Sequence, residues 1–120
     1  MTMVFEIFPD DLDETADFYE RVLGFVATDD RRTGELPYLG MARDGVRLGA
    51  SSILGPGDRG HRLPPTGVEI VLEVDDLAAE RDRVLGAGWP LAQDLTLQPW
   101  GRRDFRLLDP SGYYLRVTER

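Results

Sequence analysis

The sequence predicts an α+β fold in which a single domain of 120 residues contains two βαβββ halves. A strand-like segment, an Asp-Leu pair and a helical segment ending on Leu-Gly occur twice, and the pairs begin at Asp11 and Asp76, 65 positions apart. A repeat present in only two long copies favours a pseudo-symmetric domain over a repeat array. A tight-turn motif in the later part of each half predicts a hairpin in each copy.

The first half begins with a predicted strand at Met3–Phe8. A helix follows, with Asp11 as its cap and Glu14 three positions later completing a pattern like a capping box. Gly24 ends the helix. The apolar stripe of this helix, at helical spacing, consists of Leu12, Ala16, Tyr19, Val22 and Leu23.

A second strand is predicted at Phe25–Thr28. Tyr38–Arg43 and Val46–Ser52 are predicted to pair as a hairpin around Asp44-Gly45, a strong tight-turn pair. The segment Gly55–Pro65 is rich in Gly, Pro and Arg, which is typical of a linker. The domain would then consist of halves at 1–54 and 66–120 joined by this linker.

The second half repeats the order of the first. Its predicted elements are the strand Glu69–Val74, the helix Leu77–Leu85, the short strand Trp89–Leu91, and the hairpin strands Arg103–Leu108 and Tyr113–Thr118. The turn of this hairpin, Asp109-Pro110-Ser111-Gly112, has proline at its second position, where a β-turn favours it.

Composition narrows the range of partners. The formal net charge is −8, which argues against nucleic acid as a partner and favours neutral or cationic ligands. No apolar run approaches the roughly 18 residues of a membrane span, so no membrane partner is expected. The chain has no cysteine, which excludes disulfides and thiolate chemistry and fits the expected location in the cytoplasm.

Three segments carry a resemblance to a known family. They are DLDETADFYERVLGF, VEIVLEVDDLAAERDRVLGAG and the closing WGRRDFRLLDPSGYYLRVTE. In this order they resemble the vicinal oxygen chelate superfamily, which includes glyoxalase I, extradiol dioxygenases, fosfomycin resistance enzymes and bleomycin resistance proteins. The resemblance implies a curved mixed sheet shaped as a cup, with helices on its outer face and the ligand on the other. It also implies a homodimer, because small members usually pair.

Alternation along the strands predicts which side chains face the cup. The cup-facing residues are Val4, Glu6 and Phe8; Arg47, Gly49 and Ser51; Glu69, Val71 and Glu73; and Tyr114, Arg116 and Thr118. Their neighbours in the sequence would pack under the helices. A slip of one residue in either hairpin would exchange the two faces.

The resemblance implies four metal-ligand positions in metal-dependent members. They fall on Val4, on Gly49 or its neighbour Ala50, on Glu69 and on Arg116. Only Glu69 can ligate, because the side chains at the first two positions offer no lone pair and a guanidinium repels a cation. His61, the only histidine, lies in the linker. The sequence therefore predicts no catalytic metal and no cofactor.

The polar cup residues allow two interpretations. Glu6 and Glu69 are conceivable as a general-base pair, or they form ion pairs with Arg47 and Arg116 in the same cavity. Gly49 leaves space at a ligand position, which either admits a larger ligand or has no function.

Three aromatic residues, Phe8, Tyr38 and Trp100, are candidates for the rim or floor of the cup. Trp100 either stacks on a ligand or packs in a core or dimer interface. The loop that carries His61 is either solvated or a lid over the cup.

These features favour a member of the bleomycin-resistance-like, metal-free branch. Such a homodimer would bind a bulky, partly aromatic drug or natural product and confer antibiotic resistance by sequestration, without catalytic residues. The predicted ligand-binding residues are Glu6, Phe8, Tyr38, Arg47, Gly49, Glu69, Trp100 and Arg116. One alternative is a lyase, isomerase or dioxygenase that uses Glu69 in a noncanonical site. Another is a binding or regulatory subunit without a small ligand.

Overall fold

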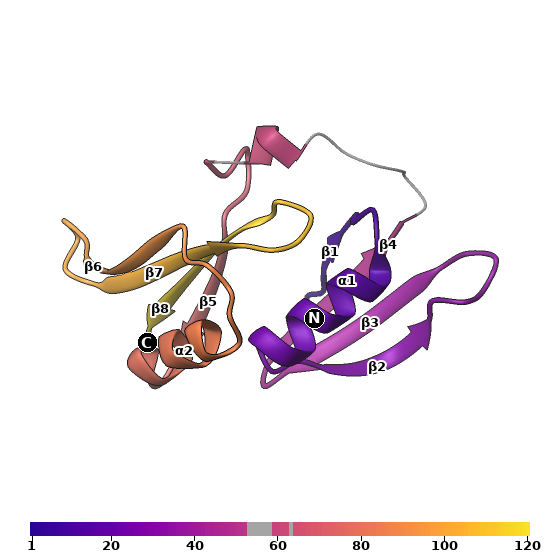
Figure 1. The fold of residues 1–120 in the computed structure, drawn as a ribbon, viewed down its shortest axis with the longest axis horizontal. Helices are drawn as coiled ribbons and strands as arrows, with labels where there is room; N and C mark the ends of the chain where they lie inside the picture. The colour runs from indigo at the N-terminus through magenta and orange to yellow at the C-terminus, as the bar shows by residue number, and fades with distance from the viewer. Residues whose placement is uncertain (53–58, 63) are drawn as a thin grey trace. The chain divides into compact units, whose positions relative to one another are not determined.

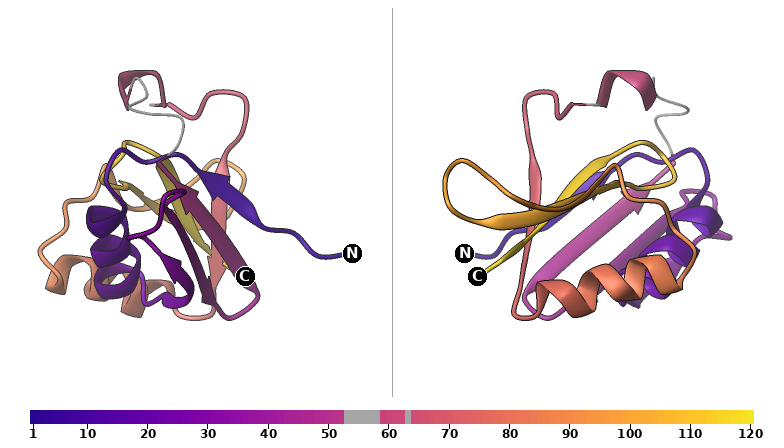
Figure 2. Two further views of the ribbon diagram at one scale, coloured as in Figure 1. Left: turned by 90° about the vertical axis from the view of Figure 1, so that its right-hand side faces the viewer. Right: turned by 60° about the vertical axis from the view of Figure 1, so that its left-hand side comes forward.

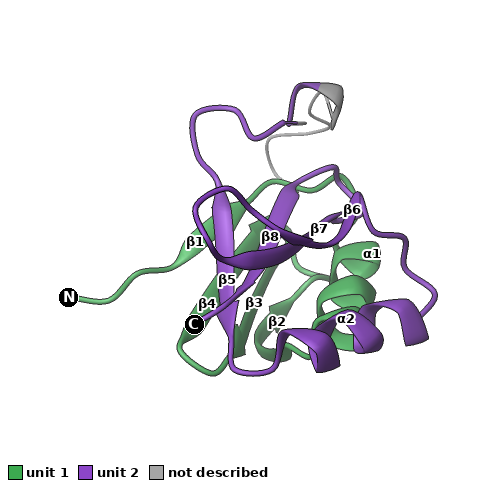
Figure 3. Ribbon diagram, turned by 90° about the vertical axis from the view of Figure 1, so that its left-hand side faces the viewer, with its two compact units in different colours: residues 1–58 green, residues 59–120 purple. Residues whose placement is uncertain are grey.

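The computed structural model describes residues 1–52, 59–62 and 64–120, and it contains two compact units, residues 1–58 and 59–120 (Figures 1 and 3). Each unit has one four-stranded mixed sheet and an α-helix, which confirms the predicted α+β class. The predicted linker Gly55–Pro65 lies partly outside the described residues. Within its described part, exposed His61 belongs to the short 3-10 turn η2, Arg59–Arg62. The predicted limits of the two halves remain a prediction.

The first unit has its strands in the order β1-β4-β3-β2, with β1 parallel to β4 and the other pairs antiparallel. The elements are β1 Phe5–Ile7, α1 Leu12–Asp17, η1 Phe18–Val22, β2 Val26–Arg31, β3 Tyr38–Arg43 and β4 Val46–Ser51. The predicted hairpin around Asp44-Gly45 is confirmed. Asp44 adopts φ 49°, a left-handed conformation that Asp tolerates better than most residues.

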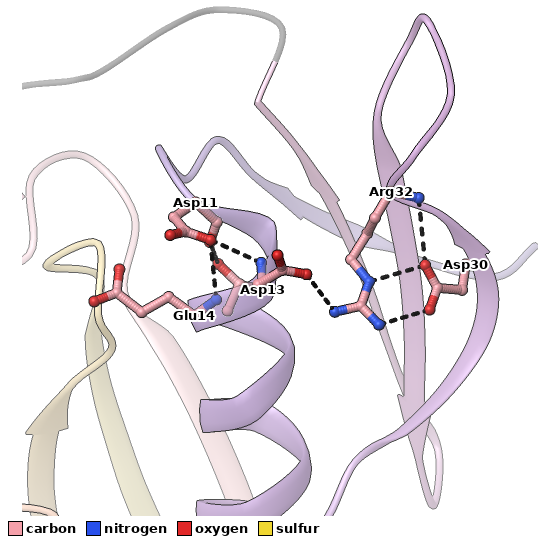
Figure 4. Close-up of polar contacts among 6 residues, drawn as sticks. Asp11, Asp13, Glu14, Asp30 and Arg32 are labelled. Carbon is pink, nitrogen blue, oxygen red and sulfur yellow. Dashed lines mark hydrogen bonds and ion pairs between the residues drawn. The ribbon is translucent and has the colours of Figure 1, made fainter.

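Asp11 caps α1 as predicted. Its carboxylate accepts hydrogen bonds from the backbone N–H groups of Asp13, at 2.9 Å, and Glu14, at 3.1 Å. These two bonds satisfy donors that the first turn of a helix otherwise leaves without partners. Figure 4 shows both bonds at the start of the helix.

After α1 the chain widens into the π-helical turn η1, whereas the sequence predicted one regular helix. Phe18, Tyr19 and Val22 are each 0% exposed. The rings of Phe18 and Tyr19 meet edge to face at 4.9 Å. A wider turn brings neighbouring residues to the same side, so both aromatic rings enter the core. Gly24, at φ 71°, then ends the segment.

The second unit has the strand order β5-β8-β7-β6, with β5 parallel to β8 (Figure 2). Its elements are β5 Ile70–Val74, α2 Leu77–Gly86, β6 Gln93–Leu97, β7 Arg103–Leu108 and β8 Tyr114–Glu119. The turn between β7 and β8 is held by Asp109, whose carboxylate accepts hydrogen bonds from the N–H groups of Ser111 and Tyr113. Gly112 adopts φ 82° there.

The predicted strand Trp89–Leu91 is wrong, because the sixth strand begins only at Gln93. The N–H of Trp89 bonds to Val84 of α2 at 3.2 Å, and its indole donates to the carbonyl of Leu108 at 2.8 Å. Pro90 has no N–H to give to a sheet. The segment therefore closes the helix and anchors it on β7 instead of pairing along its length.

Burial agrees with the predicted core face in both sheets, although Thr118, expected on the cup face, is also buried. Alternate strand residues are buried, and among the fully or nearly fully buried ones are Ile7, Leu39, Met41, Leu48, Ala50, Phe105, Leu107, Leu115 and Val117. Helix α1 contacts β3 and β4, and α2 contacts β8 (Figure 1). In the part of the chain that is described, no helix is both long and apolar enough to span a membrane.

Each unit has an ion pair that links its helix to the edge strand or the residue that follows it. In the first unit, Arg32 binds Asp13 of α1 at 2.9 Å and Asp30 of β2 at 2.7 Å (Figure 4). In the second, Arg81 of α2 forms a two-point hydrogen-bonded pair with Asp94 of β6. Each pair holds a helix against the outermost strand of its own sheet.

Candidate ligand-binding site

The strand registers align two equivalent rows of residues on the cup faces of the sheets. In strand order, the first row is Glu6, Gly49, Gly40 and Asp29, and the second row is Val71, Arg116, Arg106 and Gln93. Side chains in one such row are direct neighbours across the sheet.

In the first unit, Glu6 and Tyr38 cover Gly49. A Cβ added at Gly49 would lie 2.7 Å from the Tyr38 hydroxyl and 3.0 Å from Glu6 Oε1. The space expected at Gly49, which could have been left empty or have admitted a larger ligand, is therefore filled by side chains of this chain. The guanidinium of Arg31 lies over the ring of the same Tyr38, 5.0 Å from its centre. The glycine is needed here for close approach of a side chain.

The other two predicted residues of the first unit make different contacts. Arg47 is exposed, and its Nη1 lies 3.4 Å from Thr2 Oγ1. Among the described residues no ion pair joins Arg47 to Glu6, although the sequence allowed one. Phe8 is half-buried and follows the end of β1. The first unit therefore brings together three of its five predicted site residues.

The second unit brings together all three of its predicted site residues. Glu69 Oε1 lies 3.4 Å from Nε of Arg116, which is the ion pair that the sequence allowed. The guanidinium of Arg116 in turn lies 5.7 Å from the ring centre of Trp100, within cation–π range. Trp100, in the turn between β6 and β7, is 57% exposed. An exposed tryptophan ring with a cation nearby offers a flat apolar surface and a positive charge in one place.

These residues surround an open hollow of about 450 Å³. Its lining includes Pro65, Val68, Glu69, Trp100, Arg106 and Arg116. The volume lies within the range of sites that bind small molecules, about 300–1,000 Å³. The hollow is thus a candidate small-molecule site within the second unit, and all the residues named belong to that unit.

Arg106 is a residue of the hollow that the sequence analysis did not identify. Its Nη1 donates to the hydroxyl of Tyr114 at 3.2 Å, and its Nη2 lies 3.5 Å from the buried carboxylate of Asp104. The hydrogen bond to Tyr114 and then the pairing with Asp104 raise the pKa of Arg106, so it stays charged. The alternation that sorted four other strands also applies to Arg103–Leu108 and would have placed Arg106 on the cup face.

The family's four-ligand metal site does not fit these residues. Glu69, the one position with a suitable oxygen, faces the guanidinium of Arg116 at the fourth position. The first and second positions, Val4 and Gly49, have no donor atom in their side chains. Within the described ranges, no three His, Asp or Glu side chains are grouped closely enough to hold a metal ion.

Known proteins share this architecture. UcmS2 is 25% identical, with 98% of this chain and 96% of that chain covered and a TM-score of 0.77. TnmS3, an antibiotic binding protein from Streptomyces sp. CB03234, is 22% identical, with 99% and 94% covered and a TM-score of 0.76. A lactoylglutathione lyase from Agrobacterium tumefaciens is 20% identical, with 99% and 92% covered and a TM-score of 0.74. Among curated proteins, none matches this sequence.

The family match extends over nearly the whole chain. The model of the Glyoxalase/Bleomycin resistance protein/Dioxygenase superfamily matches residues 3–117, which include both βαβββ units except the last two residues of β8. The match confirms the resemblance read from the three sequence segments. The chain therefore belongs to the glyoxalase/bleomycin resistance protein/dioxygenase superfamily.

Proposed function

We propose that the protein binds a bulky, partly aromatic drug or natural product and confers resistance to it by sequestration. The observation that carries this proposal is Trp100, 57% exposed beside the guanidinium of Arg116 at the edge of the hollow. Burying an aromatic ring in the core stabilises a protein, so a ring left open to solvent at a hollow is available to a ligand.

Sequestration requires affinity and no catalytic group, and the polar residues of the hollow fit that requirement. Glu69 faces Arg116 at 3.4 Å, so its charge is balanced within the site instead of being available to a metal or a substrate proton. The likeness to TnmS3, an antibiotic binding protein, supports the same proposal. The chain is also similar to a lactoylglutathione lyase, so an enzyme is the alternative function. Conversion of a bound ligand into a product would favour that alternative.

We further propose that the protein acts as a homodimer in the cytoplasm, without metal or cofactor. The four-residue ligand set of the family's metal site does not fit here, and the family's small members usually pair. A specific interface of this kind buries about 1,000 Å² or more. Sedimentation should give the mass of a dimer at micromolar concentration, and a monomer under these conditions would contradict the pairing.

The binding proposal is tested by titrating the protein with a panel of polycyclic aromatic antibiotics in a calorimeter. Trp100→Ala should weaken binding by about 1–3 kcal/mol, the range for a good aromatic anchor, and should leave the circular dichroism spectrum unchanged. Trp89→Phe is the matched control, because Trp89 is anchored on Leu108 and lies outside the hollow's lining.

The control variant should lose some stability and keep its affinity. Unchanged affinity in Trp100→Ala with an intact fold would remove Trp100 from the site. Absence of saturable binding across the panel would contradict sequestration, and conversion of a panel member into product would favour the enzyme.

A further inference from the structure

Two arginines lie directly opposite each other on the cup face of the second sheet. Arg106 on β7 is paired in register with Arg116 on β8. The two side chains are only 18% and 21% exposed. Like charges at opposed positions destabilise a sheet, and burial increases the penalty. The groups that surround the two guanidiniums therefore decide what this pair can bind.

The surrounding groups leave part of each guanidinium unused. Glu69 approaches Nε of Arg116 at 3.4 Å, a separation that counts as an ion pair without forming a hydrogen bond. Tyr114 and Asp104 contact the Nη atoms of Arg106. In both arginines the Nε is buried and has no hydrogen-bond acceptor among the described residues. Buried N–H groups without an acceptor are rare, so each one calls for an explanation.

The Nε atoms have almost no exposed surface, so a ligand would reach the two guanidiniums through their Nη groups. Arginine binds carboxylates and other oxyanions with two parallel N–H donors, and such charge-assisted bonds are stronger than neutral ones. The exposed ring of Trp100 lies 5.7 Å from Arg116 and lines the same hollow as both arginines. An acidic group and a flat ring in one ligand would therefore match two adjacent surfaces of the hollow.

We propose that the hollow selects planar aromatic ligands that carry an acidic group, with the oxyanion bound by Arg106 and Arg116 and the ring stacked on Trp100. This inference rests on the proposed binding function and narrows its ligand class. It departs from the expectation drawn from the net charge of −8, because two arginines line the hollow, although Asp104 and Glu69 each lie within ion-pair distance of one of them. Glu69 competes with the ligand's acidic group for Arg116.

The test compares anthracene-2-carboxylate with anthracene-2-carboxamide by calorimetry, since the two probes have nearly the same shape and differ in charge. The wild-type protein should bind the carboxylate about 10- to 100-fold more tightly, as expected for hydrogen bonds to charged groups. Added salt should weaken binding of the carboxylate more than binding of the carboxamide.

Single substitutions test which residues cause the preference for the carboxylate probe. Arg116→Gln and Arg106→Gln should each remove most of the preference for the carboxylate and leave carboxamide affinity nearly unchanged. Glu69→Gln should strengthen carboxylate binding. Arg103→Gln is the matched control, because Arg103 lies on the same strand, carries the same charge and pairs with Glu119 outside the hollow. It should leave both affinities unchanged.

The outcomes separate this inference from the function on which it rests. Equal affinity for the two probes, with both weakened in Trp100→Ala, would overturn the acidic preference and leave the binding function intact. Failure of both probes to bind saturably would overturn the acidic preference, while the antibiotic panel tests the binding function separately. The salt series on wild-type protein decides the question if Arg106→Gln does not fold, and an equal salt effect on the two probes would contradict the inference.

Discussion

The two units share one backbone arrangement, but the side chains on their cup faces differ in size and charge. In the first, the two central positions of the row are Gly40 and Gly49, flanked by the carboxylates of Glu6 and Asp29. In the second, both central positions are arginine, flanked by Val71 and Gln93. Strand order, strand direction and cross-strand partners are otherwise equivalent.

The comparison shows which face of the sheet keeps the same kind of residue in both units and which face does not. The face under the helices keeps large apolar residues at equivalent positions, Leu39 in the first sheet and Phe105 in the second, and both are 0% exposed. The cup face shares no such set of large apolar residues between the units, so glycine in one unit can stand where arginine stands in the other. Stability therefore depends mainly on the helix-covered face, and binding depends on the open face.

Substitutions at the equivalent core positions should give the largest loss of stability. Phe105→Ala should lower the free energy of unfolding by about 3–5 kcal/mol, and Leu39→Ala by about 2–5 kcal/mol, because each leaves a cavity in a closely packed face. Denaturant titration followed by circular dichroism measures both. A loss below about 1 kcal/mol at either position would contradict its role in the core.

Adding a methyl group to the cup face of the first sheet should have a moderate effect. Gly49→Ala places a Cβ 2.7 Å from the hydroxyl of Tyr38, so that side chain must move. We expect a loss of about 1–3 kcal/mol, as for overpacked sites, together with a changed tyrosine signal in the near-ultraviolet spectrum.

Gly86→Ala in α2 is the control for this effect. Its added Cβ meets nothing within 4 Å, and alanine favours the helix, so stability should be unchanged or slightly higher. A loss of similar size in both variants would mean that the contact with Tyr38 is not the cause.

The smallest expected effect concerns the ion pairs between helix and edge strand. Hydrogen bonding from Arg81 lowers the pKa of Asp94 to about 2 from its ordinary 3.8. Because the folded-state pKa is depressed, the pair stabilises the fold above pH 3.8 and loses this contribution as the pH falls through 2. In the first unit, hydrogen bonding from Arg32 also lowers the pKa of Asp30.

Thermal unfolding of Asp94→Asn and Asp30→Asn at a series of pH values measures this contribution. Wild type should exceed each variant slightly at neutral pH, and the difference should vanish in acid and shrink in high salt, since both pairs are exposed. A difference that persists at pH 2 would show that the carboxylate charge is not its source.

The sequence was enough to predict the architecture because the two copies of the pattern agree and each strand alternates. It did not reveal the π-helical turn, because a stripe at regular helical spacing includes Tyr19 and omits its neighbour Phe18, which is also fully buried. It also placed a strand at Trp89–Leu91, where β-forming residues instead anchor the end of α2.

The candidate site was predictable in part for a related reason. The family's metal-ligand positions include Arg116 but not Arg106, its cross-strand partner, so they predict only one of the two arginines. Alternation identifies the face on which a side chain lies, but it does not reveal which neighbours meet. The contact of Tyr38 with Gly49, which fills the expected space, depends on tertiary geometry that spacing does not encode.

The most direct test of binding at the second sheet is a nuclear magnetic resonance titration with anthracene-2-carboxylate that follows the indole and arginine Nε–H signals. Saturable shifts should appear for Trp100, Arg106 and Arg116, while the indole of Trp89, bonded to Leu108, stays unchanged. Shifts confined to other residues, or none for Trp100 and either arginine at saturation, would contradict the assignment of ligand binding to this face.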